Sequence, residues 1–144
     1  MTSQNDSSNR DSETIVPCSK GRLLIVDDEP GIRNVFGHIL SNGLPNCLIE
    51  LAVNGAEAVA AFSAVHHALI LMDLHMPVMD GETAFYKIRD FCAEQKWEMP
   101  AVVFCTGYDP SLNLRKIVSS SESHYLLRKP VANDVLIEIL RARL

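Results

Sequence analysis

The chain has 144 residues, of which 47% are hydrophobic and 22% charged, and its formal net charge is −5. This length suits one compact domain with its own core, and the negative charge disfavours a nucleic-acid-binding surface. The apolar runs are far shorter than the ~20 residues of a membrane-spanning helix, and the polar N-terminus is not a signal peptide. The four cysteines are widely spaced without a C-x-x-C pair, so we expect reduced thiols in a cytoplasmic protein and no zinc site.

The first 20 residues differ in composition from the rest of the chain. They are rich in Ser, Asn and Asp and show no sustained hydrophobic period. We therefore predict a disordered tail or linker over residues 1–20 and a single domain over residues 21–144.

From Arg22 onwards, short apolar runs alternate with amphipathic helical patterns. The runs that predict strands are Leu23–Val26, Leu48–Leu51, Leu69–Met72, Ala101–Cys105 and Tyr125–Leu127. Start and stop signals support the helices between them: Pro30 suits a first turn, Gly43 a stop, and Asn54 an N-cap. Asp109, followed directly by a proline, is the predicted N-cap of the fourth helix.

Strict alternation of strands and helices predicts an α/β fold with a parallel sheet covered on both faces. Right-handed crossovers leave few arrangements, and we predict a flavodoxin-like (βα)5 three-layer sandwich with strand order 2-1-3-4-5. The first and third strands are almost purely apolar, as central strands should be, whereas Glu50 is easier to place on an edge strand. Function in such sheets gathers at the carboxyl ends of the strands.

Polar residues follow four of these strands. The strands end in Asp27-Asp28-Glu29, Asp73, Thr106-Gly107 and Arg128-Lys129-Pro130. The ends of the first and third strands are neighbours in the predicted sheet, so Asp27, Asp28 and Asp73 should converge. Because three carboxylates repel one another, we expect a hard divalent cation such as Mg²⁺ between them. With Lys129 and Thr106 nearby, the site suits phosphoryl transfer to Asp73 as the nucleophile.

The sequence resembles the receiver domains of two-component response regulators. The resemblance rests on LLIVDDEP (23–30), LMDLHMPVMDG (71–81), VVFCTG (102–107) and LRKP (127–130), and extends over residues 22–144. It implies that Asp73 accepts a phosphoryl group from a histidine kinase or a histidine phosphotransfer protein and later loses it by hydrolysis. It also implies a signalling protein, not an enzyme, that catalyses only its own phosphorylation and dephosphorylation.

The resemblance further implies how the metal is bound. Asp27 and Asp28 would organise Mg²⁺, or Mn²⁺ in its place, with Asp28 as the more direct ligand. Asp73 and the backbone carbonyl of His75 would complete the protein ligands. His75 and Tyr108 are expected to flank the site and to influence hydrolysis by shaping the access of water.

The switch residues depart in part from the pattern of the family. Thr106 resembles the switch hydroxyl, Lys129 the lysine that contacts the phosphoryl group, and Pro130 the proline after a cis bond. The aromatic residue usually found three positions before the lysine is here Leu126, with Tyr125 one position earlier. Strand alternation sends these two side chains to opposite faces. Either Leu126 fills the position without a hydroxyl, or a local irregularity lets Tyr125 take the role.

The resemblance also suggests partners. A downstream protein would bind the surface formed by the fourth helix, the fifth strand and the fifth helix, and the chain would be a monomer or a phosphorylation-dependent dimer. We expect no nucleic-acid or membrane partner. The end of the chain at Leu144 suggests either a single-domain regulator or a receiver from a larger hybrid kinase.

Two other functions use parts of the same constellation. A Mg²⁺-dependent phosphohydrolase of the haloacid dehalogenase type would carry a second Asp two residues after the nucleophile, where this chain has His75. A flavodoxin-like binding module without phosphorylation would not need Asp73, Thr106 and Lys129 together. Away from the site, we expect His66 and His67 to lie in a surface turn and Trp97 to be half-exposed.

Overall fold

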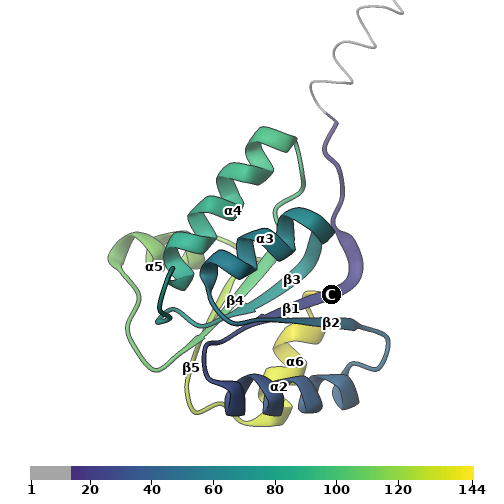
Figure 1. The fold of residues 1–144 in the computed structure, drawn as a ribbon, viewed down its shortest axis with the longest axis vertical. Coiled ribbons are helices and arrows are strands. Elements are labelled where there is room, and N and C mark those ends of the chain that lie inside the picture. The colour runs from purple at the N-terminus through teal and green to yellow at the C-terminus, as the bar shows by residue number, and fades with distance from the viewer. Residues whose placement is uncertain (1–13) are drawn as a thin grey trace, which may run out of the picture.

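The computed structural model describes residues 14–144. Its elements are β1 (Ser19–Val26), α2 (Pro30–Gly43), β2 (Leu48–Ala52), α3 (Gly55–Val65), β3 (His67–Met72), α4 (Gly81–Gln95), β4 (Ala101–Thr106), α5 (Leu112–Ser119), β5 (Tyr125–Arg128) and α6 (Asn133–Arg141). The strands form one parallel sheet in the order β2-β1-β3-β4-β5, which confirms the predicted flavodoxin-like fold. Helices α3, α4 and α5 cover one face, and α2 and α6 cover the other (Figure 1). No helix in the described part of the chain is long and apolar enough to span a membrane.

Two hydrophobic cores lie on the two faces of the sheet. Along β1, Leu24 and Val26 pack towards α3 and α4, while Leu23 and Ile25 pack towards α2 and α6. All four side chains are at most 1% exposed, because both faces of this central strand are covered. Full burial of such a side chain stabilises the fold by about 1.5–3 kcal/mol, so the apolar central strands fix the sheet that carries the site.

Short polar side chains start three of the helices. Asn54 accepts a hydrogen bond from the Glu57 amide (2.8 Å), as the sequence predicted, and Asp80 caps α4 in the same way. The predicted N-cap at Asp109 is wrong, because α5 is capped by Ser111, whose hydroxyl accepts from the Leu114 amide at 3.1 Å. The Asp109 carboxylate instead forms ion pairs with two arginines on the elements that flank it.

The predicted disordered segment extends too far along the chain. β1 begins at Ser19, and Val16 forms a parallel bridge with Trp97 in the loop after α4. The Val16 amide donates to the Lys96 carbonyl (2.8 Å), and the Glu98 amide donates to the Val16 carbonyl (2.7 Å). These main-chain bonds hold residues 14–20 in place without an apolar period that the sequence could reveal. The remainder of the predicted tail, residues 1–13, lies outside the described residues.

The two histidines before β3 are buried, so the predicted surface turn is wrong. His66 is 5% exposed, and its ring stacks on that of Trp97 at 4.1 Å. His67 is fully buried as the first residue of β3, and its Nε2 lies 2.7 Å from Glu50 Oε1. The Phe62 ring on α3 lies against both imidazoles, with its centroid 5.5 Å from that of His66 and 6.4 Å from that of His67. Trp97 itself is partly exposed, as predicted.

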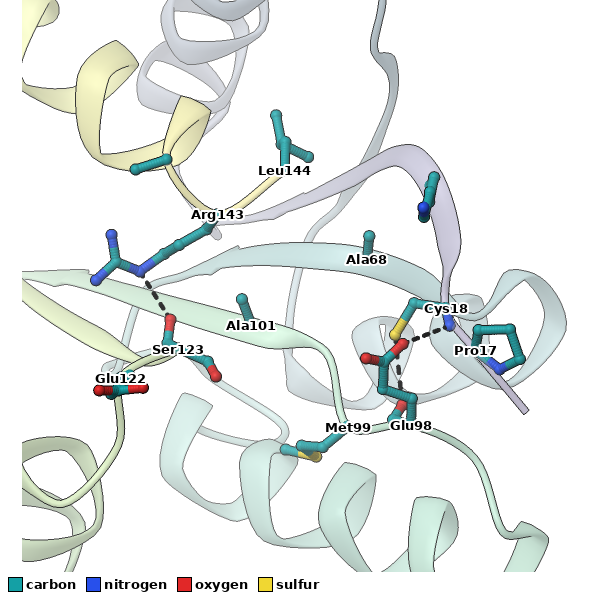
Figure 2. A pocket seen from close by; sticks show the side chains of 12 residues that line it. Pro17, Cys18, Ala68, Glu98, Met99, Ala101, Glu122, Ser123, Arg143 and Leu144 are labelled. Carbon is teal, nitrogen blue, oxygen red and sulfur yellow. Dashed lines mark hydrogen bonds between the residues drawn. The ribbon is translucent and has the colours of Figure 1, made fainter. Parts of the chain in front are cut away.

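The amino edge of the sheet carries a hollow of about 480 Å³ between the start of β1, the loop before β4 and the C-terminal turn (Figure 2). Ala68 and Ala101, which have small side chains, are among the residues that line it. On one wall the Glu98 carboxylate accepts a hydrogen bond from the Cys18 amide at 2.9 Å. This hollow lies at the opposite edge from the carboxyl ends of the strands, so it is separate from the predicted site.

Candidate functional site

Three carboxylates converge at the carboxyl edge of the sheet. Asp27 follows β1 and Asp73 follows β3, and the pairing of Val26 with Met72 places the two ends side by side. One oxygen from each of Asp27, Asp28 and Asp73 lies within 4.8 Å of the others. Asp27 and Asp73 are only 2% and 8% exposed, so little water screens their charges. The predicted convergence of the three acids is confirmed.

Lys129 is the cation that faces these acids. Its Nζ lies 3.0 Å from Asp27 Oδ2 and 3.2 Å from Asp73 Oδ2. Burial alone would lower the pKa of Lys129, but the hydrogen bond that its ammonium donates to Asp27 and the charge of Asp73 outweigh this effect and raise the pKa above its ordinary value. The ammonium is therefore retained at neutral pH. The bond between Lys129 and Pro130 is cis, as predicted.

The donor set fits a hard divalent cation. Three carboxylates face one ammonium, so acidic groups outnumber basic groups in the cluster. Carboxylate oxygens are the ligands that Mg²⁺ prefers. The backbone of His75 is also close, since its amide lies 3.4 Å from Asp73 Oδ1. Its carbonyl as a metal ligand stays a prediction.

Sequence reasoning missed two contacts that shape the acid pair. The Arg33 guanidinium, one turn into α2, donates to the Asp27 carbonyl at 2.7 Å, and the Glu29 amide donates to Asp27 Oδ1 at 3.0 Å. Both bonds join residues that are close in the sequence, and together they hold the loop after β1 against the start of α2. The position of Arg33 one turn after the acidic run was the only signal, and an arginine there is more commonly solvent-facing.

A glycine allows α4 to approach the end of β3. The Gly81 amide donates to the Leu74 carbonyl at 2.9 Å, and a Cβ at Gly81 would lie 2.1 Å from the Asp73 carbonyl oxygen. No side chain fits into this contact. Gly81 thus completes the loop that turns Asp73 into the site.

The loops after β3 and β4 meet beside Asp73. Thr106 is 1% exposed, and its hydroxyl accepts a hydrogen bond from the Tyr108 amide at 3.2 Å. The ring of Tyr108 lies against the ring of His75, with 4.2 Å between centroids. The two residues that were expected to flank the site are therefore in contact with each other.

The structure distinguishes the two arrangements considered for Tyr125 and Leu126. The pairing of β4 with β5 is regular, with Val103 opposite Tyr125 and Phe104 opposite Leu126, so no irregularity is present. Leu126 packs against the core under α5, where the aromatic side chain was expected. Tyr125 is 40% exposed, and its ring lies 4.8 Å below the Arg143 guanidinium on the other side of the strand.

Known proteins resemble this chain over almost its whole length. The sequence profile of the response regulator receiver domain matches residues 23–141. The chemotaxis protein CheY of Halobacterium salinarum is 28% identical over 124 residues, which cover 84% of this chain and 98% of that protein. The sensor histidine kinase TmoS of Ectopseudomonas mendocina is 32% identical over 122 residues, which cover 85% of this chain but 11% of the kinase.

Solved structures show the same fold. The chemotaxis protein CheY4 of Vibrio cholerae superposes with a TM-score of 0.68 at 24% identity, covering 88% of this chain and all 100% of that one. A CheY-like receiver domain protein of Methanospirillum hungatei superposes with the same TM-score of 0.68 at 23% identity. The matched region includes every strand end that carries the site, and the chain therefore belongs to the family of response regulator receiver domains.

Proposed function

We propose that this chain is a phosphorylation-activated receiver of a two-component phosphorelay, with Asp73 as its phosphoryl acceptor. Members of the family are in general phosphorylated on an aspartate, bind Mg²⁺ and interact with histidine kinases and downstream targets. The observation that carries the proposal is the buried Asp73 carboxylate, held 3.2 Å from the Lys129 ammonium and beside two further acids.

The site residues have complementary tasks in the transfer. Asp27, Asp28 and Asp73 would hold Mg²⁺, which supplies positive charge at the phosphoryl oxygens when it is bound. An oxygen of Asp73 attacks phosphorus in line, and the bond from phosphorus to the imidazole nitrogen of the donor breaks. Lys129 stays protonated beside the attacking carboxylate and balances the charge on the transferred group.

An apolar groove on this chain, beside the acceptor, is a surface that the donor domain can occupy. A groove of about 750 Å³ lies between α2 and the loop after β5, with Ile32, Phe36 and Val131 among its lining residues and Lys129 at one end. A phosphohistidine that reaches Asp73 must bring its own domain over this surface. We therefore assign the groove to the histidine kinase or the phosphotransfer protein.

Phosphorylation would change the loop after β4. The Thr106 hydroxyl, which now accepts from the Tyr108 amide, would turn towards the phosphoryl oxygens and release that amide. The loop then repacks, and the surface of α5, β5 and α6 changes its affinity for a downstream protein. This is a population shift between two existing arrangements.

Intact-mass measurement after incubation with acetyl phosphate and Mg²⁺ tests the proposal. We expect the wild-type protein to gain the mass of one phosphoryl group and Asp73→Asn to gain none. A matched control is Asp80→Asn, which removes an exposed acid outside the cluster. Wild-type protein that forms no adduct with acetyl phosphate or with a cognate kinase would refute the proposal.

A further inference from the structure

A cavity of about 460 Å³ opens to solvent between α5 and β5. Its floor is apolar and its rim is basic, with Val118, His124, Tyr125, Leu126, Arg115 and Arg143 among its lining residues. The cavity lies beside Leu126, at the strand position where the family usually has an aromatic ring. A leucine fills less of the space between β5 and α5 than a ring would, so room for one large side chain remains.

The rim is positively charged although the chain is negatively charged. Residues 109–144 contain six Lys or Arg against four Asp or Glu, a net charge of +2, whereas residues 1–108 contain seven against fourteen, a net charge of −7. Arg115 is exposed at the mouth of the cavity. A ligand for this surface should therefore carry negative charge.

Arg143 is held in place before any ligand arrives. Its Nε donates to the Ser123 carbonyl at 2.7 Å (Figure 2), and its Nη1 donates to the Ile139 carbonyl at 3.0 Å. Its guanidinium also lies 4.8 Å over the Tyr125 ring. A guanidinium that is already ordered loses little conformational entropy when it binds an anion.

His124 adds a polar group to the wall. Its Nδ1 accepts a hydrogen bond from the Val102 amide at 3.0 Å. Burial, and then the charge of Arg143, lower the pKa of His124, so the ring is neutral and carries its proton on Nε2. The wall thus combines an apolar floor with hydrogen-bond donors, as in the core of a protein interface.

We propose that this cavity anchors a downstream protein partner, which inserts an aromatic side chain that is flanked by acidic residues. This inference rests on the proposed function, which assigns partner binding to α5, β5 and α6. Residues 1–13 of the chain contain no aromatic residue and cannot supply the anchor. A partner protein fits better than a small metabolite, because the charges lie at an open rim and not around an enclosed ligand.

The position of the cavity links it to the switch. Arg115 on α5 pairs with Asp109 in the loop after β4 (3.9 Å between Nη2 and Oδ1), and Leu126 lies opposite Phe104 in β4. Repacking of that loop after phosphorylation therefore moves one wall of the cavity. We expect the affinity for the anchor to differ between the two phosphorylation states.

Amide NMR of the full chain with an acetylated Glu-Asp-Trp-Glu-Asp peptide as probe tests the anchor site, with and without acetyl phosphate and Mg²⁺. Saturable shifts are expected at Val118, Ser119 and Leu126. Peptides with Ser in place of Trp, or Lys in place of the acids, should bind at least about tenfold more weakly, a difference of about 1.4 kcal/mol.

Two variants block the cavity from different sides. Leu126→Phe fills it from the floor, and Ser119→Trp obstructs its exposed mouth without touching the core, so the test does not depend on one variant folding. Each should weaken the probe about tenfold. Exposed Ala64→Trp, at a distance on α3, is the control and should bind as the wild type does.

The outcomes separate this inference from the proposed function. Suppose that intact mass shows the phosphoryl adduct. Absent shifts in both phosphorylation states, or unchanged binding of the probe by both blocking variants, would then overturn the anchor site and leave the proposed function standing. Absence of the adduct refutes the proposed function instead. Concentration-dependent self-association that perturbs the same amides without the probe also overturns the inference, because a second copy would then cover the cavity.

Discussion

Replacing Gly81 with alanine tests whether the close approach of α4 holds Asp73 in position. The new Cβ would lie 2.1 Å from the Asp73 carbonyl oxygen, and a normal van der Waals separation begins at 3.4 Å, so the two must move apart by about 1.3 Å. Forced contacts of this kind destabilise folded proteins by about 1–3 kcal/mol. A displacement of the nucleophile by 1 Å can cost about 100-fold in rate.

The assay measures two quantities on the same variant. We expect urea unfolding of Gly81→Ala to show the lost stability, and single-turnover phosphorylation by acetyl phosphate to show a rate reduced by up to about 100-fold. Gly31→Ala is the matched control, because nothing lies within 4 Å of a Cβ there in the first turn of α2. It should be neutral or more stable by up to about 1 kcal/mol, with an unchanged rate. Equal behaviour of the two variants would refute the steric argument.

The other predictions concern the metal, the pH and the switch loop. Mg²⁺ at 100 times its dissociation constant should raise the unfolding free energy by about 2.7 kcal/mol, and Asp28→Asn should reduce this gain in thermal melts. Burial lowers the pKa of His67, so the unfolded chain takes up a proton first and stability should fall as the pH drops below about 6.5. Urea unfolding measures this as a midpoint concentration that falls with decreasing pH. The fall should be shallower in His67→Gln and unchanged in His38→Gln, where the histidine is exposed. Arg128→Gln removes the bond to the Gly107 carbonyl (3.3 Å) and the ion pair with Asp109, so the amides of residues 107–109 and 111 should exchange up to about fivefold faster. Unchanged exchange would contradict a restraining role.

The fold and the acid cluster could be predicted because they depend on signals that are local in the sequence. The alternation of apolar runs and helical periods specifies a parallel sheet, and an acid directly after a buried run must lie at the edge of the sheet. Asp27 and Asp73 met these two conditions, and the pairing of their strands brought them together. The lysine was equally visible, because it follows the last apolar run.

Contacts between elements distant in the sequence were harder to predict. Asp109 has the sequence of an N-cap, but Arg128 from β5 engages its carboxylate, and Ser111 caps the helix instead. Val16 has no apolar neighbours at a regular period, yet it pairs with Trp97, some eighty residues away along the chain. In both cases a partner from another element decides the local structure, and no local pattern contains that partner.

The departure at Leu126 changes how the proposed switch can reach its output surface. A side chain without a hydroxyl or a ring cannot follow Thr106 by exchanging a hydrogen bond, so the motion has to pass through the loop after β4. Polar contacts connect this loop to its surroundings: the Tyr108 amide to Thr106, the Arg128 guanidinium to the Gly107 carbonyl and to Asp109, and Asp109 to Arg115 on α5. The last of these leads directly to the rim of the cavity beside Leu126. The cavity into which, on our proposal, a partner inserts an aromatic ring therefore lies beside the leucine that stands in the aromatic position.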